Sequence, residues 1–250
     1  MKTLIFGIAT GILLFITQIQ AQGVFNIIGG GNEAFDVLAE VPGLVAWYKG
    51  SLGVTLDGDT VEVWADQSGS NNNLTKTFEA VQGWFKMDVI NNKPSLKWQT
   101  ASPELKLASG LNLNTYTVFI ISQRGSDLSA GYLTYSTSGV GYSRYDVTNT
   151  MLVDVSTPLE TANGTCLVGE THLTQVSSNA TTITVYVKGA SVDTTITSTD
   201  GLNWTFLSLG VATAGRANNE VAEIIISNQN LSDAVKLAVR NYLISEYAVP

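Results

Sequence analysis

Residues 63–73 read VWADQSGSNNN, an apolar strand end followed directly by residues that bend a backbone. Val63 and the indole of Trp64 suit a packed sheet, because β-branched and aromatic side chains pack well on a pleated surface. The Asp, Ser, Gly and Asn residues that follow are typical of turns. The stretch therefore predicts a strand that ends in a polar turn, which places its side chains at a surface.

The composition fits one all-β domain. Of the 250 residues, 44% are hydrophobic and only 14% are charged, with 23 glycines against 5 prolines. This excludes a coiled coil and a disordered chain, because the apolar content is ample for a core. The formal net charge of -8 makes nucleic acid and anionic membrane surfaces poor partners.

The N-terminus resembles a secretory signal. Lys2 precedes the apolar run Leu4–Ile16, and Ile19–Ala21 supplies a cleavage site, so residues 1–21 are predicted to be removed. The alternative is an uncleaved anchor, which is the one route by which this chain would contact a membrane. We expect a secreted or cell-surface protein, with a virion surface as the alternative location.

The mature chain divides into a Gly-rich arm or linker, residues 22–43, and a single domain, residues 44–250. Short β-branched or aromatic runs with Gly, Asn, Asp or Ser at their flanks predict strands throughout that domain. These runs are Leu44–Tyr48, Thr60–Trp64, Ser95–Trp98, Tyr116–Ser122, Tyr132–Tyr135, Met151–Val155, Thr171–Val176, Thr181–Val187, Ser191–Thr197 and Phe206–Val211.

The C-terminal part gives the most detailed expectations. Ile224–Ile226 reads as a central strand buried on both faces, and Ser232 is placed to cap a helix over residues 233–246. In the run 181–187, alternation puts Ile183, Val185 and Val187 on one face, and Lys188–Gly189 supplies the following hairpin turn. The only cysteine, Cys166, is expected to be a buried small hydrophobe.

Several stretches together resemble the concanavalin A-like superfamily, in its laminin-G-type jelly-roll form. The resemblance covers roughly residues 42–248, and it implies an all-β, two-sheet antiparallel jelly-roll β-sandwich with a short C-terminal helix. It also implies that Gly69 takes a positive φ and that Asp66 and Asn71–Asn73 satisfy backbone groups of a turn. The stretches are LVAWYKGS, VEVWADQSGSNNNLTK, KPSLKWQTASPELKLASGL, YTVFIIS, ITVYVKGA and VAEIIISNQNLSDAVKLAVRNYLISEY.

Catalytic signatures of this fold are missing from the sequence. A retaining glycanase would resemble Glu-x-Asp-x-x-Glu on one strand, and no such string occurs. A polysaccharide lyase would resemble a Gln-x-His strand, but the only histidine, His172, has no Gln two positions before it. Alternation places His172 opposite Leu173, pointing outward as a solvated or hydrogen-bonded residue. The sequence predicts a protein that is not an enzyme.

Recognition is the preferred function, and the sequence offers candidate ligand contacts. A Tyr-rich segment over residues 129–146 combines aromatic faces, which stack on sugars, with small polar residues that hydrogen-bond adaptably. The alternative is that half of these tyrosines face the core. Two further indoles are candidates because their neighbours indicate loops, whereas Trp47, Trp64 and Trp98 are expected in the core. The candidate contacts are Tyr132, Tyr135, Tyr142, Arg144, Tyr145, Trp84 and Trp204.

Calcium is the cofactor that the resemblance suggests. Laminin-G-type domains often hold this ion at the sandwich rim, and Asp57, Asp59 and Asp66 offer the hard oxygen ligands that it requires. The alternative is that Asp57-Gly58-Asp59 forms a type I′ hairpin turn and Asp66 a backbone-bonding turn. The partner is predicted to be a glycan or another surface ligand. A structural or decorating protein that assembles with itself or other subunits is the second hypothesis, and a polysaccharide hydrolase or lyase the third.

Overall fold

The computed structural model describes residues 35–76, 84–99, 105–125, 130–134, 142–145, 151–153, 159–162, 166–189, 193–199, 208–209 and 219–250. The compact unit begins at Phe35 and ends at Pro250. The predicted signal segment and residues 22–34 of the predicted arm lie outside the described residues. Within the described ranges, no helix combines the length and the hydropathy needed to cross a membrane.

Sheet A is an antiparallel sheet of eight described strands. Their order is β15-β14-β13-β8-β17-β6-β5, and β1 also pairs with β17. The strands are β1 (Leu44–Lys49), β5 (Trp84–Ile90), β6 (Lys93–Gln99), β8 (Thr115–Gln123), β13 (Thr171–Asn179), β14 (Ile183–Lys188), β15 (Asp193–Ser198) and β17 (Glu220–Ser227).

Sheet B holds the nine other described strands, in the order β12-β11-β10-β9-β16-β7-β4-β3-β2. Two helices complete the unit, α1 (Val37–Glu40) and α2 (Asp233–Tyr247). The protein is therefore a two-sheet antiparallel jelly-roll β-sandwich with a C-terminal helix, as predicted. The strands are β2 (Val54–Asp57), β3 (Thr60–Trp64), β4 (Leu74–Lys76), β7 (Leu105–Leu107), β9 (Ala130–Thr134), β10 (Tyr142–Tyr145), β11 (Met151–Val153), β12 (Leu159–Glu160) and β16 (Ser208–Leu209).

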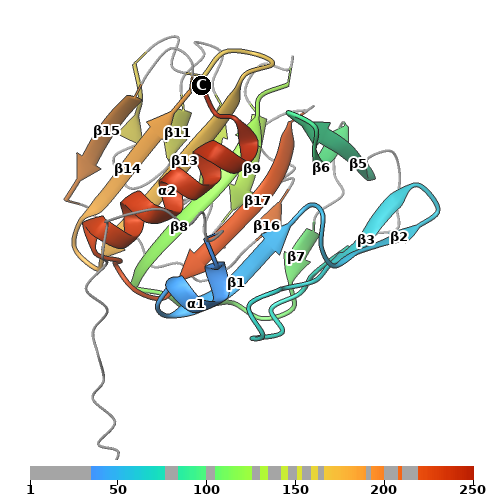
Figure 1. Cartoon of the computed structure of the whole chain (residues 1–250), viewed down its shortest axis with the longest axis horizontal. Helices are drawn as coiled ribbons and strands as arrows, with labels where there is room; N and C mark the ends of the chain where they lie inside the picture. Colours follow the sequence, from blue (N-terminus) through green and yellow to red (C-terminus); the bar gives the residue numbers. More distant parts are fainter. Residues whose placement is uncertain are drawn as a thin grey trace, which may run out of the picture. The chain divides into compact units, whose positions relative to one another are not determined.

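Sheet A has an apolar layer on each face. In β17, Ile224 and Ile226 belong to the core that sheet A shares with sheet B, whereas Ile225 belongs to a second cluster with Val239 and Leu243 of α2. Figure 1 shows α2 lying across sheet A. Strands covered on both sides need apolar residues at successive positions, which explains the continuous Ile run. The prediction of a doubly buried central strand is confirmed.

The N-terminal boundary of the domain lies before the predicted Leu44. Phe35 stacks on Tyr242 with ring centroids 5.3 Å apart. Val37 and Val41 are buried in the same cluster as α2, and Asp36 caps α1 by accepting from the Leu38 N–H. The end of the predicted arm is thus part of the packed unit.

Most predicted strands are confirmed within a few residues, and β3 matches its predicted bounds. One expectation was wrong. Trp84 and Phe85 begin strand β5, which pairs with β6, and do not lie in a loop. The predicted alternation over residues 183–187 is confirmed, because Ile183, Val185 and Val187 all belong to the inter-sheet core. Lys188 was predicted in the hairpin turn, but it is the last residue of β14 and pairs with Asp193 of β15.

The turn that follows β3 closes the outer edge of β1. Asp66 is its centre: one carboxylate oxygen, Oδ1, accepts from the Trp47 N–H at 2.9 Å and the Ser68 N–H at 2.8 Å. The other, Oδ2, accepts from the Ser68 hydroxyl at 2.8 Å and the Asn72 N–H at 3.0 Å. Asn72 in turn donates its amide to the Val45 carbonyl at 2.7 Å.

These bonds satisfy backbone groups on the free edge of β1, which would otherwise be left unpaired. Alternate residues of β1 point their backbone groups away from β17, and the turn satisfies them, including the Trp47 carbonyl that accepts from the Gln67 N–H at 2.7 Å. Gly69 has φ 87°, as expected. Asn73 accepts from the Asp66 N–H at 2.9 Å. The role predicted for Asp66 as a residue that satisfies backbone groups is confirmed.

We predict that Asp66→Ala lowers the free energy of unfolding by about 2 kcal/mol, because several partly buried donors lose an ionised acceptor. Urea denaturation measures the change. The matched control is Asp57→Ala, which alters an exposed acidic residue and should cost less than about 0.5 kcal/mol. Equal stability of the two variants would contradict this account of the edge.

Candidate functional site

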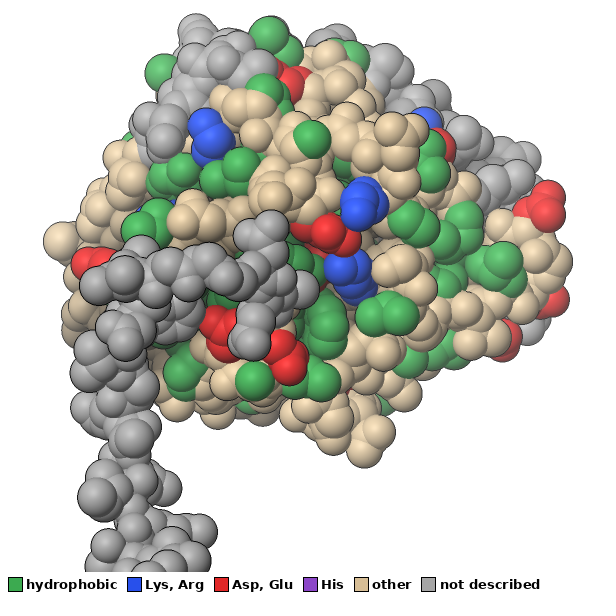
Figure 2. Space-filling view, in the orientation of Figure 1, with side chains coloured by type: hydrophobic (Ala, Val, Ile, Leu, Met, Phe, Trp, Pro, Cys, Tyr) green, Lys and Arg blue, Asp and Glu red, His purple; other side chains and the backbone are tan. Residues whose placement is uncertain are grey.

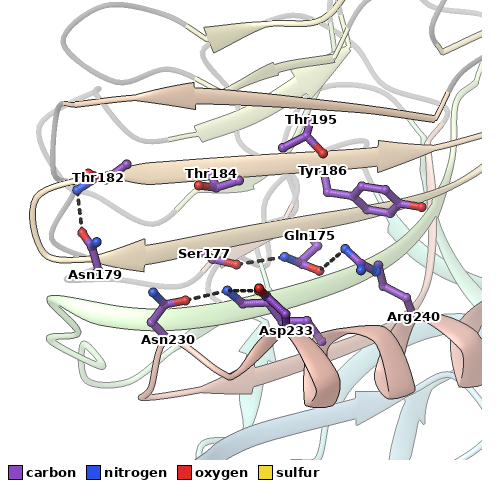
Figure 3. A pocket seen from close by; sticks show the side chains of 11 residues that line it. Gln175, Ser177, Asn179, Thr182, Thr184, Tyr186, Thr195, Asn230, Asp233 and Arg240 are labelled. Carbon is purple, nitrogen blue, oxygen red and sulfur yellow. Dashed lines mark hydrogen bonds and ion pairs between the residues drawn. The ribbon is translucent and has the colours of Figure 1, made fainter.

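A polar groove lies on the outer face of sheet A, beside α2. Its volume is about 280 Å³, and strands β13, β14 and β15 contribute one side while α2 and the residues before it contribute the other. Figure 3 shows these side chains converging from the strands and the helix. The groove is lined by Gln175, Ser177, Asn179, Thr182, Thr184, Tyr186, Thr195, Asn230, Asp233, Lys236 and Arg240.

Strand alternation builds the groove floor. In β14, Val185 and its apolar neighbours at 183 and 187 face the inter-sheet core, so Thr184 and Tyr186 face the groove. Gln175 and Ser177 do the same on β13, and each is only 3% exposed. The Gln175 amide donates to the Ser177 hydroxyl at 3.0 Å. The floor is therefore polar, and its buried side chains are fixed by their own hydrogen bond.

The helix side supplies the charged groups. Lys236 and Arg240 lie one turn apart on α2, so both reach the groove. The Arg240 guanidinium lies 4.4 Å from the centroid of the Tyr186 ring, and its Nη1 donates to the Gln175 Oε1 at 3.3 Å. Lys236 donates to the Asn230 side chain at 2.7 Å. Burial lowers the pKa of Lys236, and the nearby Arg240 charge acts in the same direction while Asp233 opposes it.

Charge is sparse on this side of the molecule. Figure 2 shows scattered Lys, Arg, Asp and Glu side chains among uncharged polar and hydrophobic ones on the face that carries α2. Asp233 is the groove's only carboxylate among the residues that the structure describes, and its side chain is fully exposed. Two cations and one rim carboxylate leave the groove positive in a chain whose net charge is -8.

A buried carboxylate on β17 fixes α2 and hence the groove wall. Glu223 accepts from the Trp47 indole at 2.8 Å, from the Tyr247 hydroxyl at 2.8 Å and from the Tyr242 hydroxyl at 3.0 Å. The Lys49 ammonium lies 3.8 Å from the same carboxylate. Because the two tyrosines belong to α2 and the other two residues to β1, this network joins the helix to the sheet.

The network is a buried polar cluster, so burial and neighbouring groups shift the pKa values of its titratable side chains. Burial raises the pKa of Glu223 above its ordinary value, although Lys49 and the three hydrogen-bond donors oppose that shift. Burial also raises the pKa values of Tyr242 and Tyr247, and the neighbouring Glu223 charge raises them further. Both tyrosines therefore remain protonated donors at neutral pH.

The raised pKa of Glu223 predicts a pH dependence of stability. A raised folded-state pKa gives a contribution that is fully present below the unfolded value of 4.5 and declines as pH rises toward the folded pKa. Glu223→Gln removes this titration. Urea denaturation from about pH 4.5 to pH 7 should therefore show the wild type losing stability relative to the variant.

The absolute stability of Glu223→Gln does not affect this comparison, because the prediction concerns the change in the difference with pH. Tyr247→Phe is a companion variant that keeps the carboxylate and removes one buried donor. It should lower the free energy of unfolding by about 1–3 kcal/mol. A stability difference between wild type and Glu223→Gln that is constant over this pH range would contradict the raised pKa.

The structure brings some of the predicted contact residues onto neighbouring strands. Tyr132 lies on β9, and Tyr142, Arg144 and Tyr145 lie on the adjacent strand β10 of sheet B. Tyr132 has no paired residue on β10, because Ser143 pairs with Leu133 and the next residue, Arg144, pairs with Gly131. Trp84 lies on β5 of the other sheet. Tyr135 and Trp204 lie outside the described residues.

The three predicted calcium ligands occupy two turns. Asp57 and Asp59 flank Gly58 at the tip of the β2–β3 hairpin, whereas both carboxylate oxygens of Asp66 accept protein hydrogen bonds. Over the described ranges, no group of three acidic, His or Cys side chains is placed to hold a metal ion. Gly58 has φ 59° and Asp59 does not have a positive φ, so the hairpin turn is not type I′.

His172 requires a correction. It does not point outward but is completely buried on the inner side of β13, with Nε2 3.0 Å from the Glu170 carboxylate. The alternation itself was right, because Leu173 lies on the opposite face, but that face is covered by α2 and is also apolar. Cys166 is buried as predicted, and burial raises the pKa of its thiol to about 12.

Sequence reasoning missed the groove. The signal was present in two patterns: the polar or amphipathic residues at every second position of β14, and the spacing of Lys236 and Arg240 on the C-terminal helix. Neither pattern gives the position of α2 over the sheet. Without that position, the two sets of side chains cannot be assigned to one site.

No protein-family model matches the sequence, and no curated protein matches it. Solved structures do share the fold. Domain 4 of AbnA, a GH43 extracellular arabinanase from Geobacillus stearothermophilus, in complex with arabinotriose, superposes with a TM-score of 0.53 at 13% identity over 77% of this chain and 95% of that one.

Two other similar structures are larger. The binding domain of botulinum neurotoxin DC in complex with SialylT has a TM-score of 0.54 and 12% identity, with 81% of this chain and 52% of that chain covered. Trypanosoma rangeli sialidase has a TM-score of 0.54 and 14% identity, with 82% and 33% covered. The chain thus spans about half of the toxin domain and a third of the sialidase. These likenesses show a shared β-sandwich fold.

Proposed function

We propose that this protein is a secreted, non-catalytic carbohydrate-binding module of the laminin-G-type fold, and that the groove beside α2 is its binding site. The observation that carries the proposal is the buried polar floor of Gln175 and Ser177 next to the cation–π pair Tyr186 and Arg240. The proposal concerns recognition alone, and no reaction is assigned to the groove.

The lining chemistry suits a saccharide. Sugars present many hydroxyl groups. The amide and hydroxyl groups of the groove both donate and accept hydrogen bonds, and the guanidinium donates them. A volume of about 280 Å³ is close to the lower limit of small-ligand sites. The floor is held by its own hydrogen bonds, which reduces the entropy lost on binding. The site is therefore preorganised for a small polar ligand.

Two similar folds occur in structures with carbohydrate ligands. The arabinanase domain is in complex with arabinotriose and the toxin binding domain with SialylT. At 12–13% identity these likenesses concern the fold, so they support the class of ligand without identifying contact residues here. We propose a glycan as the partner on the chemistry of the groove itself.

The positions of the acidic side chains favour a binding site over a hydrolytic active site. A retaining glycosidase needs two carboxyl groups on either side of the scissile bond. In the part of the groove that the structure describes, Asp233 is the single carboxylate, and it lies at the exposed rim. Glu223 is buried among donors from Trp47, Tyr242 and Tyr247. Neither arrangement supplies a paired acid and nucleophile.

We predict that filling the groove abolishes binding. Thr184→Trp places a large side chain among the lining residues, and a strand accepts Trp without loss of backbone pairing. A glycan-array screen of the purified protein identifies a ligand, and titration calorimetry should then show at least about a hundredfold weaker binding for the variant, because the cavity is occupied.

The matched control is Thr55→Trp, which makes the same change at an exposed position of β2 in sheet B. Its affinity should equal that of the wild type, and its unfolding transition should match that of Thr184→Trp. Full affinity in a folded Thr184→Trp variant would show that the ligand binds elsewhere.

The Tyr-rich strands provide the competing surface. Simultaneous replacement of Tyr142 and Tyr145 by Ala tests it, because both lie on β10. If the groove is the binding site, this double variant should bind the array-selected glycan with wild-type affinity. A loss of affinity without unfolding would instead place the site on β9 and β10.

A further inference from the structure

We infer that the groove selects saccharides that carry a carboxylate, such as a uronic acid or a sialic acid. This inference rests on the proposed function and specifies its ligand class. Two cationic side chains among the described residues line the groove, and their partners are neutral or exposed. Among the described lining residues, no buried carboxylate lies nearby.

Arg240 is held in place without an acidic partner. Among the described residues, its contacts are one hydrogen bond to the neutral Gln175 amide and the face of the Tyr186 ring. A guanidinium has five N–H donors in a planar fork that matches a carboxylate in a bidentate geometry. The contact with the Tyr186 ring and the hydrogen bond to Gln175 hold the guanidinium in place before a ligand arrives.

Lys236 adds a second positive charge one helical turn away. Its side chain is only 13% exposed, and its acidic neighbour Asp233 lies 3.9 Å away with a fully exposed side chain. Because the Asp233 carboxylate is fully exposed, solvent screens its attraction to Lys236. Like charges four residues apart on a helix repel each other, so a bound anion between Lys236 and Arg240 would relieve that repulsion.

The neutral residues that line the groove favour a saccharide acid over a small inorganic anion as the ligand. Thr184 and Ser177 and the amide of Asn179 extend the polar lining along the strands, away from Arg240. A small inorganic anion would contact the cations alone and leave this part unused. A sugar acid would place its carboxylate at the cations and its ring hydroxyls against the Thr, Ser and Asn side chains.

The test compares glycans that differ only in the carboxylate. Three pairs serve as probes in titration calorimetry: sialyllactose against its methyl ester, oligogalacturonate against its methyl ester, and a glucuronate-ended oligosaccharide against its glucose-ended equivalent. We expect the acid of at least one pair to bind about tenfold or more tightly than its neutral partner, and added salt to weaken it. The pair that responds identifies the source of the carboxylate.

Substitutions of Arg240 test whether the groove causes the preference for the acid form of the glycan. Arg240→Gln should remove the preference for the acid, whereas Arg240→Lys should keep part of it, since the charge remains without the fork. Lys188→Gln is the matched control, because it removes one positive charge from β14 at a residue that does not line the groove. It should leave both affinities unchanged.

The outcomes separate this inference from the proposed function. Equal binding of acid and neutral forms, lost from both in Thr184→Trp, would overturn the acid preference and leave the carbohydrate site standing. An acid preference that survives in Arg240→Gln would also overturn it. Binding that is unaffected by Thr184→Trp, or a lack of binding across the array and the three pairs, would overturn the proposed function and this inference together.

Discussion

The docking of α2 onto the outer face of sheet A is the contact on which the rest of the structure depends. Val239, Leu243 and Tyr247 bury that side of the helix in the second apolar cluster. The Glu223 network then fixes the helix laterally, because its donors come from both α2 and β1. One edge of the helix is thereby held beside β13 and β14, and a polar groove remains along it.

The same contact determines the character of the central strands. In an ordinary sandwich, one face of each sheet meets the core and the other meets water. Here β8 and β17 carry continuous apolar runs, 118–121 and 224–226, because Phe119 and Ile225 pack under α2 while Val118 and Ile224 pack between the sheets. Toward β15 the helix no longer covers the sheet, and the outward residues become Thr, Ser, Gln and Tyr. The change from apolar to polar outward residues marks the boundary between the docked helix and the groove.

Much of the fold could be predicted from local patterns. The bounds of β3, the Ser232 cap of α2 and the turn bonds of Asp66 to the backbone of Ser68 and Asn72 depend on neighbours within a few residues, and each is confirmed. The orientation of His172 could not be predicted, because alternation identifies two faces without saying which is buried. Sheet A has apolar layers on both, so an apolar Leu173 did not identify the inner one.

The groove was beyond prediction for a related reason. Gln175 and Arg240 are far apart in sequence, and each alone resembles an ordinary surface residue on a strand or a helix. Their meeting depends on the lateral position of α2, which the Glu223 network sets through a residue of β17 and two aromatic hydroxyls of α2. A groove assembled by tertiary contact leaves no contiguous motif in the sequence.

A crystal structure of the protein with its array-selected oligosaccharide tests the central claim most directly. The account predicts electron density for the sugar in the groove, with one ring against Tyr186 and Arg240 and hydroxyl groups on Thr184 and Gln175. Density for the sugar on the β9–β10 strands, with the groove filled only by water, would contradict it.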